Sequence, residues 1–457
     1  MQAIDSARVQ LLNDLPARDG TYVLYWMQQS QRAVMNHALE YAVQRANERG
    51  ESVVAAFGLT DHYPEANLRH YTFLLEGLRD TKRRLADRGL KLVVRRGEPA
   101  AVALDLAANA SLVVCDRGYL RHQRQWRQKV ARRAPCSVVQ VESDVVVPVE
   151  VVSDKTEYAA RTIRKKLHRH LDRFLVPVAS TPVRIQSLPL HVKGLALDDL
   201  KPATATNETD VQPVTKHYRG GTGEAMRVFQ RFLSDHLSHY AENRNQPQTD
   251  HVSHMSKYLH FGQISPLWLA LEARECTSAE NVEAFLEELL VRRELCMNFV
   301  HFTPDYDRYE GLPAWALKTL DEHRRDARQP VYTPEQLEDA ATHDAYWNAA
   351  MLEMRETGYM HNYMRMYWGK KILEWSESPE GAFETVLRLN NRYFLDGRDA
   401  NSFAGAAWVF GRHDRPWTER PVFGKTRYMN ARGLERKCDI HAYLKKVQTI
   451  TGCSCIE

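Results

Sequence analysis

Hydrophobic and polar positions follow two different periods along the chain. Through residues 1–150, apolar runs rich in β-branched residues alternate with amphipathic stretches of helical length. The predicted strands are Thr21–Trp26, Ser52–Leu59, Leu90–Arg95, Ser111–Asp116 and Ser137–Val147, and helices such as Asn36–Arg49 and Tyr71–Arg88 lie between them. This alternation is typical of βαβ units and of a parallel sheet covered on both faces. It predicts an α/β domain with a Rossmann-like parallel sheet over residues 1–174.

From Gly223 onward the pattern is helical almost throughout, without strand-like runs. The predicted helices are Gly223–Tyr240, Pro266–Arg274, Asn281–Phe299, Pro334–Gly358, His361–Glu374 and Pro379–Asn390. Three of them begin at a Ser-Pro or Thr-Pro dipeptide, which combines a helix cap with proline at the first helical position. Residues 216–457 are therefore expected to form an all-helical domain. Residues 175–215 contain five prolines and no regular period, which indicates a long connector that wraps over a surface.

Composition excludes several classes of protein. The chain has 457 residues, of which 44% are hydrophobic and 26% are charged, as in soluble globular proteins. No apolar run approaches the ~20 residues of a membrane-spanning helix, and the N-terminus lacks the pattern of a secretory signal. Seven scattered cysteines, with Cys453 and Cys455 the only close pair, indicate reduced thiols. We therefore expect a monomeric cytoplasmic protein without a membrane anchor or a metal site.

The predicted sheet lacks two nucleotide-binding signatures. No GxGxxG motif follows the first strand, and no GxxxxGK[ST] loop occurs. The α/β domain is thus expected either to bind a ligand at the switch point of its sheet or to act as a scaffold.

Five of the nine tryptophans lie between residues 347 and 417. Trp368 and Trp375 are seven residues apart on one predicted helix, so both rings project from the same face. Two interpretations of that face remain open. It is either a stripe of core packing, or a relay of indole rings that carries electrons between solvent and a buried redox cofactor.

Two neighbouring segments could bring opposite charges together. TGYMHNYMRM at 357–366 places a histidine, an asparagine and an arginine on a predicted helix, and LNNRYFLDGRDANSFAGAAW at 389–408 contains a predicted turn at Asp396-Gly397. An arginine and an aspartate from these segments would form a buried pair, unless both are solvated surface charges. Upstream, Glu288 either pairs with Arg292 along a helix or faces a pocket.

Positive charge is concentrated near the C-terminal end. The whole chain has a formal net charge of +4, whereas Phe410–Lys437, here called the basic segment, has eight lysines and arginines against three acidic residues, a net charge of +5. Trp417, Phe423 and Tyr428 are interleaved with these cations. The combination suits phosphate contacts and base stacking, although a solvated loop whose long side chains lie along the surface has the same composition.

On these motifs the chain resembles the DNA photolyase and cryptochrome family throughout, and most closely the class II cyclobutane pyrimidine dimer photolyases. The matching stretches are YWMQQSQRAVMNHAL at 25–39, TGYMHNYMRMYWGKKILEW at 357–375, LDGRDANSFAGAAW at 395–408 and HDRPWTERPVFGKTRYM at 413–429. The resemblance implies an α/β antenna-type domain and a helical catalytic domain that binds FAD and DNA. It also implies that excited, reduced FAD passes an electron to a pyrimidine dimer flipped out of UV-damaged DNA.

The resemblance assigns roles to individual residues. The implied catalytic set is Glu288, Asn390, Arg365 and Asp396, and the implied relay is Trp368, Trp347 and Trp375. The implied flavin contacts are Tyr240, Ser253, His254, Met255, Ser256, Asn362, Arg365, Asn390, Asp396 and Gly397. Arg365 would pair with Asp396 beside the flavin ring, where local charge tunes the redox states. Asn390 would lie near flavin N5, because an amide can donate or accept there.

For the substrate, the resemblance implies contacts from Glu288, Met366 and Trp408 to the damaged bases, with Glu287 as the alternative carboxylate. Phosphate contacts are expected from the basic segment, through Arg412, Arg415, Arg420, Lys425 and Arg427. Other members carry tryptophans where this chain has Val291 or Arg292 and Ala406. The resemblance leaves open whether the α/β domain also holds an antenna chromophore, such as a deazaflavin or a folate.

Three alternative functions accompany the leading hypothesis. They are a cryptochrome-like photoreceptor without repair activity, a flavoprotein that binds DNA without catalysis, and a lyase for (6-4) photoproducts. Retention of the implied catalytic and lesion-binding residues favours repair, and the class II-like motifs disfavour the (6-4) lyase. Signalling relatives often carry long C-terminal extensions, and few residues follow the last matching motif here.

Overall fold

The computed structural model describes residues 3–202, 206 and 208–452. Contacts within the chain divide it into two compact units. The α/β unit comprises Met1–Asp154, Lys165–Gln230 and His254–Thr277, and the helical unit comprises Lys155–Arg164, Arg231–Ser253 and Ser278–Glu457. Because each unit takes several segments of the chain, the domain boundaries 1–174, 175–215 and 216–457 stay a proposal. The pair Cys453 and Cys455 lies outside the described residues.

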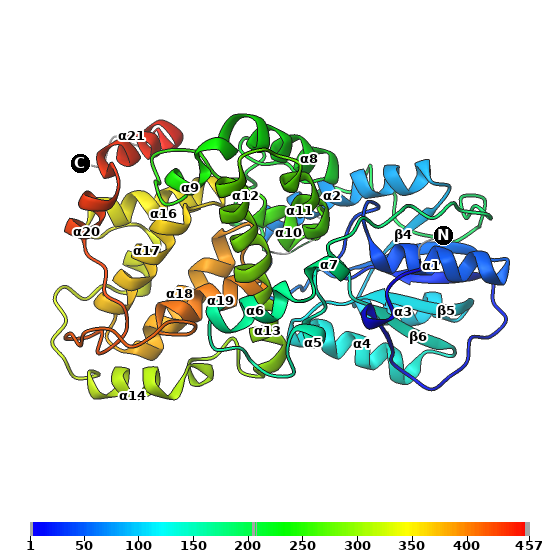
Figure 1. Ribbon diagram of the computed structural model, residues 1–457, viewed down its shortest axis with the longest axis horizontal. Helices are drawn as coiled ribbons and strands as arrows, with labels where there is room; N and C mark the ends of the chain where they lie inside the picture. The colour runs from blue at the N-terminus through cyan, green and yellow to red at the C-terminus, as the bar shows by residue number, and fades with distance from the viewer. Residues whose placement is uncertain (1–2, 203–205, 207, 453–457) are drawn as a thin grey trace. The chain divides into compact units, whose positions relative to one another are not determined.

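The α/β unit is built on a six-stranded sheet in the order β1-β6-β5-β2-β3-β4, coloured blue to cyan in Figure 1. The strands are β1 (Val9–Leu11), β2 (Tyr22–Trp26), β3 (Ser52–Leu59), β4 (Lys91–Arg96), β5 (Ala110–Asp116) and β6 (Ser137–Val141). The five predicted strands are confirmed and pair in parallel, but β6 ends at Val141 and not at Val147. The antiparallel strand β1 is an addition, because three residues are too few to show a period.

Alternation along β2 explains why both faces of the sheet are covered. Val23 and Tyr25 belong to the core formed with α1 (His37–Arg49) and α2 (Leu68–Asp87). Leu24 and Trp26 belong to the opposite core, formed with α3 (Pro99–Ala107) and α4 (Arg121–Arg133). All five β2 side chains are buried, as expected of a central parallel strand.

The proline-rich connector follows the edge of this sheet. The Leu195 N–H donates to the Val94 carbonyl of β4 at 2.7 Å, and the Lys91 N–H donates to the Ser187 hydroxyl at 2.8 Å. These bonds cover part of the edge that β4 would otherwise leave unpaired. The described part of the connector thus wraps over a surface, as predicted.

The remaining helices confirm the predicted helical character. Those outside the helical unit are α5 (Val149–Val152), α7 (Leu171–Phe174), α10 (Ser256–His260) and α11 (Pro266–Arg274), while α6 (Ala160–His168) and α8 (Thr222–Arg231) each have residues in both units. The helical unit holds α9 (Tyr240–Asn243), α12 (Ala279–Leu286), α13 (Arg293–Phe302), α14 (Ala314–Glu322), α15 (Pro334–Glu338), α16 (Ala345–Thr357), α17 (Asn362–Trp375), α18 (Pro379–Tyr393), α19 (Ala400–Val409), α20 (Ala431–Lys437) and α21 (Ile440–Thr451). Nowhere in the described chain is a helix both long and apolar enough to cross a membrane.

Three predicted helices are interrupted. Pro334–Gly358 is two helices, α15 and α16, because Asp344 caps a new start by accepting the Trp347 N–H at 2.9 Å. Gly223–Tyr240 contains the π-helical turn η3 (Phe232–His236), and Asn281–Phe299 contains the π-helical turn η5 (Glu287–Arg292). The three Ser-Pro and Thr-Pro helix starts are confirmed, each with its side-chain cap.

Candidate functional site

A bidentate ion pair joins α17 to the turn before α19. Arg365 Nη1 and Nη2 donate to Asp396 Oδ1 and Oδ2 at 2.9 and 3.1 Å, and Arg365 Nε donates to the Met360 carbonyl at 2.9 Å. The guanidinium carbon lies 3.8 Å from the centre of the Phe394 ring. The two charged side chains are only 23% and 11% exposed, so charge-assisted bonds hold the pair in one orientation. The expected arginine–aspartate pair is present.

The turn that carries Asp396 is fixed by amide side chains at the end of α18. Asn390 Nδ2 donates to Asn391 Oδ1 at 2.9 Å and to the Ser402 hydroxyl of α19. A Cβ at Gly397 would lie 2.7 Å from the Asn390 carbonyl oxygen, so the backbone packs there too closely for a side chain. Asn390 and Asp396 are both buried. Together with the ion pair they form a fixed polar corner in the helical unit.

Three buried indoles extend from this corner. The Trp368 ring lies 6.3 Å from the Phe394 ring. Trp347 Nε1 donates to the Trp368 carbonyl at 3.0 Å, and the Trp347 and Trp375 rings are 5.8 Å apart. None of the three tryptophans is more than 2% exposed. They are core residues and also a continuous chain of contacts, so the geometry is compatible with both interpretations of the tryptophan face.

The two neighbouring glutamates have different partners. Glu287 accepts two hydrogen bonds from Arg164 at 2.9 and 2.6 Å and one from Arg292 at 3.3 Å, whereas Glu288 forms an ion pair with Arg244, just after α9. Of the two alternatives for Glu288, the pairing with Arg292 is wrong: in the π-helical turn η5, Arg292 pairs with Glu287, five residues before it. Sequence reasoning missed Arg244, which lies 44 positions upstream of Glu288 in a segment without a motif.

Trp408, the expected lesion contact on α19, lies close to an amine and a guanidinium. Lys370 Nζ is 5.5 Å from the centre of its ring, and the Arg427 guanidinium is 5.7 Å away. Lys370 is buried and donates to the Val409 carbonyl, and burial lowers the pKa of this amine to about 7. Trp408 and Met366 of α17 are both half-buried. The only sequence signal for Lys370 is its place in α17, two positions after Trp368 and two before Ile372.

The residues expected at the flavin diphosphate are Tyr240, Ser253, His254, Met255 and Ser256. The first two belong to the helical unit and the last three to the α/β unit. Tyr240 packs edge-on against the rings of Phe232 and Phe285, while His254 Nδ1 lies 3.3 Å from the Tyr218 hydroxyl. Asn362, expected at the same cofactor, is the exposed first residue of α17. The roles of these residues remain predictions.

The basic segment contains cations of two kinds. The exposed Trp417 ring lies between Arg415 and Arg427, whose guanidinium carbons are 5.1 and 5.2 Å from its centre. Arg412 is half-buried and donates to the Gly311 carbonyl, and burial lowers its pKa. The other expected phosphate contacts, Arg420 and Lys425, are exposed. Arg412 therefore anchors the segment to the rest of the helical unit, while the exposed cations face solvent.

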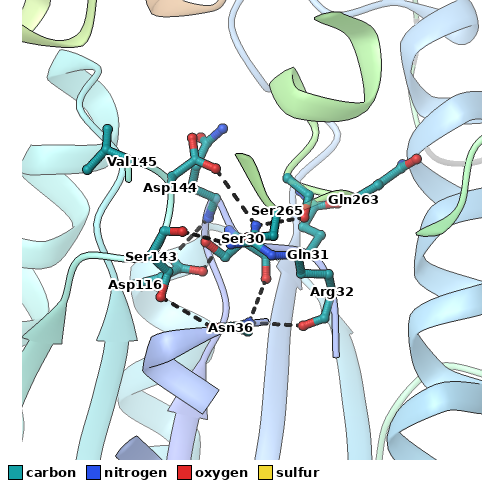
Figure 2. A network of polar contacts seen from close by, with 12 residues as sticks. Ser30, Gln31, Arg32, Asn36, Asp116, Ser143, Asp144, Val145, Gln263 and Ser265 are labelled. Carbon is teal, nitrogen blue, oxygen red and sulfur yellow. Dashed lines mark hydrogen bonds and ion pairs between the residues drawn. The ribbon is translucent and has the colours of Figure 1, made fainter. Parts of the chain in front are cut away.

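The α/β unit holds a second polar network beyond the carboxyl ends of β2 and β5, as Figure 2 shows. Asp116 accepts three backbone N–H groups of the loop after β2 at 2.8 to 2.9 Å. Asn36 Nδ2 donates to the Ser30 carbonyl at 3.2 Å, and Arg32 donates to the Ser143 carbonyl at 2.7 Å. This is the switch point, where open sheets bind ligands. Because these groups bond to one another, the network fixes the loop and identifies no ligand contact.

Comparison with solved structures identifies the fold. The chain superimposes on a class III photolyase from Agrobacterium tumefaciens with a TM-score of 0.74 at 18% identity, over 94% of this chain and 87% of that one. A cryptochrome from Synechocystis gives a TM-score of 0.69 at 14% identity, over 94% and 99%. The fold is therefore that of photolyases and cryptochromes.

Sequence relatives identify the family. Residues 23–184 match the family model of DNA photolyase. The chain is 49% identical to a deoxyribodipyrimidine photo-lyase of Methanothermobacter thermautotrophicus, over 97% of this chain and 99% of that protein. It is 40% identical to a deoxyribodipyrimidine photo-lyase of Oryza sativa, over 98% and 91%. The chain belongs to the DNA photolyase family and is an enzyme of that family.

Proposed function

We propose that this enzyme repairs cyclobutane pyrimidine dimers in UV-damaged DNA by light-driven electron transfer from reduced FAD, and that it belongs to class II. The observation that carries the proposal is the partly buried Arg365–Asp396 pair at one end of a chain of three buried indoles. The relative at 49% identity, which bears the name of this activity, supports the same conclusion.

The donor set of the polar corner fits a flavin ring. The ring edge presents donors and acceptors in alternation, and the corner offers a guanidinium, a carboxylate and the Asn390 amide. The missing side chain at Gly397 lets the turn pack against the Asn390 carbonyl, which keeps Asp396 and the Asn390 amide in one corner. When bound, fully reduced FAD supplies the photoexcited electron that splits the dimer. The residues proposed to hold it are Arg365, Asp396, Asn390, Gly397 and Asn362 at the ring, and Tyr240, Ser253, His254, Met255 and Ser256 at the diphosphate.

The proposed lesion pocket combines apolar walls with one polar anchor. A dimer that has left the base stack needs apolar contacts and a few hydrogen bonds. Met366 and Trp408 supply the apolar contacts, and Glu288 supplies the hydrogen-bond acceptor, either while it still contacts Arg244 or after that ion pair has opened. Glu287 is the weaker candidate, since Arg164 and Arg292 already engage its carboxylate.

The three indoles are proposed to act as the electron relay. Trp375 is the outermost of them by its contacts, because the half-buried Tyr332 and the exposed His343 pack against its ring at 5.5 and 5.2 Å. Electrons entering there would pass through Trp347 and Trp368 toward Phe394 and the polar corner. This direction keeps the cofactor site reduced without exposing it to solvent.

An antenna chromophore, a deazaflavin or a folate, belongs to the same proposal without assigned residues. Asp116, Arg32 and Asn36 at the switch point of the sheet are engaged with neighbouring protein groups, whereas Ser30 Oγ and Gln31 Oε1 are buried without a hydrogen-bond partner in the described chain. Release of small molecules from the purified protein by denaturation, followed by absorbance and mass spectrometry, would identify any second chromophore beside FAD.

A single illumination experiment tests the proposed function. The purified protein should show a flavin spectrum and, after reduction, should remove dimers from dimer-containing DNA in light and not in darkness. DNA with (6-4) photoproducts only is the matched substrate control. A flavin-loaded protein that leaves dimers intact under light would favour the cryptochrome-like photoreceptor, since the fold is shared with a cryptochrome.

A further inference from the structure

One loop of the basic segment, residues 417–425 and here called the basic loop, folds back on itself. The Trp417 N–H donates to the Lys425 carbonyl at 2.8 Å, and the Arg420 N–H donates to the Gly424 carbonyl at 2.9 Å. Arg420 and Lys425, two of the cations proposed to contact DNA phosphates, are exposed on this loop. Because no described helix or strand includes the loop, its shape depends on what it packs against.

The basic loop is seated on the C-terminal end of α14. The Lys425 N–H donates to the Thr319 hydroxyl of α14 at 3.0 Å, and a Cβ at Gly424 would overlap that hydroxyl oxygen. Just after α14, the Asp326 carboxylate accepts the Val422 N–H at 2.8 Å. All of these groups belong to the helical unit. Contacts with this end of α14 therefore hold the loop in place.

His323, the residue that follows α14, joins two carboxylates. Its Nδ1 lies 2.5 Å from Asp326 Oδ2, and its Nε2 lies 2.9 Å from Glu419 Oε1 of the basic loop. An ionised carboxylate only accepts hydrogen bonds, so both ring nitrogens must donate, which only the imidazolium does. Hydrogen bonds to Glu419 and Asp326 raise the pKa of His323 above its usual 6.5. The bond from His323 lowers the pKa of Glu419, so the proton belongs to the ring.

Two cations adjoin these carboxylates. Lys425 Nζ lies 3.8 Å from Glu419 Oε2, and the charge of Arg328 acts on Asp326. Arg324, the next residue after the histidine, forms an ion pair with α18. Among these residue types only histidine changes its charge near neutral pH. The imidazole is therefore the group through which pH acts on the cluster.

Loss of the ring proton opens one of the two contacts. A neutral imidazole donates through one nitrogen and presents a lone pair at the other, and that lone pair would face a carboxylate. Glu419 is the contact that opens, because its side chain is 49% exposed against 31% for Asp326, and Asp326 is also held by the Val422 N–H. The basic loop then loses a charged contact with the end of α14.

We propose that His323 is a positioning residue for DNA binding, which as an imidazolium latches the basic loop to α14 and releases it when the proton is lost. The inference rests on the DNA contacts proposed above for the basic segment. A latched loop holds Arg420 and Lys425 in one arrangement, so less conformational freedom is lost when DNA binds. Because the pKa of folded His323 is raised, the latch is complete below pH 6.5 and is lost as pH rises through that raised value.

Hydrogen–deuterium exchange of the basic loop tests the latch on the full-length flavin-loaded protein. Parent and variants are compared at the same pH, which cancels the intrinsic pH dependence of exchange. Below pH 6.5, amides of residues 417–425 should exchange about three- to tenfold faster in His323→Gln than in the parent, since charge-assisted hydrogen bonds are lost. The difference should disappear at alkaline pH, where the parent ring is also neutral.

Three further variants separate the latch from simple packing. His323→Arg, which donates to both carboxylates at every pH, should keep the loop protected across the range. Glu419→Gln should move the midpoint of the parent transition to lower pH, because it removes the main cause of the raised pKa of His323. His441→Gln, a change at an exposed histidine of α21, should behave as the parent protein.

The outcomes separate this inference from the proposed function. At constant salt, the affinity for duplex DNA, measured by fluorescence anisotropy, should fall more steeply with pH in the parent than in His323→Arg. Equal exchange in the parent and His323→Gln at every pH would overturn the latch. A loosened loop with unchanged DNA affinity would overturn the positioning role. A parent protein that shows the latch and its effect on DNA affinity, but no dimer repair in light, would refute the proposed function alone.

Discussion

At the level of single residues, Lys370 links the lesion-facing helix to the relay helix. Its amine is buried and donates to the Val409 carbonyl of α19, while its ring contact is Trp408. Burial disfavours the charged form of an amine, and here this effect outweighs the opposing attraction of the Asp414 carboxylate, so the pKa of Lys370 falls to about 7. A neutral Lys370 still donates its hydrogen bond, so the residue positions α19 without placing a full charge beside the lesion pocket.

The depressed pKa of Lys370 predicts how stability depends on pH. The unfolded chain holds this amine at its ordinary pKa of 10.5. Between pH 7 and 10.5 the unfolded state therefore binds more protons than the folded state, so the unfolding free energy rises with pH. In Lys370→Met this rise should be shallower, by up to about 1.4 kcal/mol per pH unit. Urea unfolding at several pH values in this window measures it, with Lys318→Met at an exposed site as the control. Equal slopes in parent and Lys370→Met would contradict the buried neutral amine.

The two glutamates of η5 offer a matched pair of variants. Glu288→Gln should lower dimer repair per absorbed photon about tenfold, since a charged hydrogen bond to the damaged bases is weakened, with flavin content unchanged. Glu287→Gln should keep repair and lower the unfolding free energy by at most about 1 kcal/mol, as expected of a partly exposed ion pair. Repair assays on both variants determine which of the two glutamates contacts the damaged bases. Loss of repair in Glu287→Gln alone would move the lesion contact to that residue.

At the level of elements, the sequence predicts those features that depend on neighbouring residues. The caps at Ser265, Thr333 and Ser378 are confirmed because a hydroxyl before proline is a local signal. The π-helical turn η5 is not predicted, because one extra residue in a helix leaves the apolar period nearly unchanged. Because of this turn, Arg292 pairs with Glu287, five residues before it, and not with Glu288, four residues before it. Phe394, which links the ion pair to Trp368, lacks any signal except its place two residues before Asp396.

The spacing of tryptophans on α17 leads to a test that separates relay from packing. Trp368→Phe keeps an aromatic ring in the core, and the Trp347 Nε1 bond survives because its acceptor is the backbone carbonyl of residue 368. Photoreduction of oxidised flavin should slow strongly, whereas repair by pre-reduced enzyme should be largely kept. Trp26→Phe, equally buried but in the sheet, should leave photoreduction unchanged. Unchanged photoreduction in Trp368→Phe would leave only the packing role.

At the level of the whole molecule, the net charge of +4 conceals a local excess. The structure divides the basic segment further, into cations fixed by protein contacts and cations that face solvent. Composition alone could not make this division, because burial depends on contacts with distant residues such as Gly311 and Phe299, whose ring lies 4.6 Å from the Arg412 guanidinium. The domain-scale pattern is thus predictable from the sequence, while the role of each cation depends on tertiary contacts.

This division predicts different salt dependences for DNA binding. Each lost phosphate contact reduces the slope of the logarithm of affinity against the logarithm of salt concentration by about one. Arg415→Ala and Arg420→Ala should each reduce this slope by about one. Both variants should bind all DNA sequences more weakly to the same extent, because phosphate contacts carry no sequence information. Arg412→Ala should leave the slope unchanged and instead lower the unfolding free energy by about 1–3 kcal/mol, because it removes the donor to a part-buried carbonyl. Fluorescence anisotropy at several salt concentrations distinguishes them. If Arg412→Ala lowered the slope like the other two, that side chain would reach the DNA when the complex forms, and the anchoring role assigned to it would be wrong.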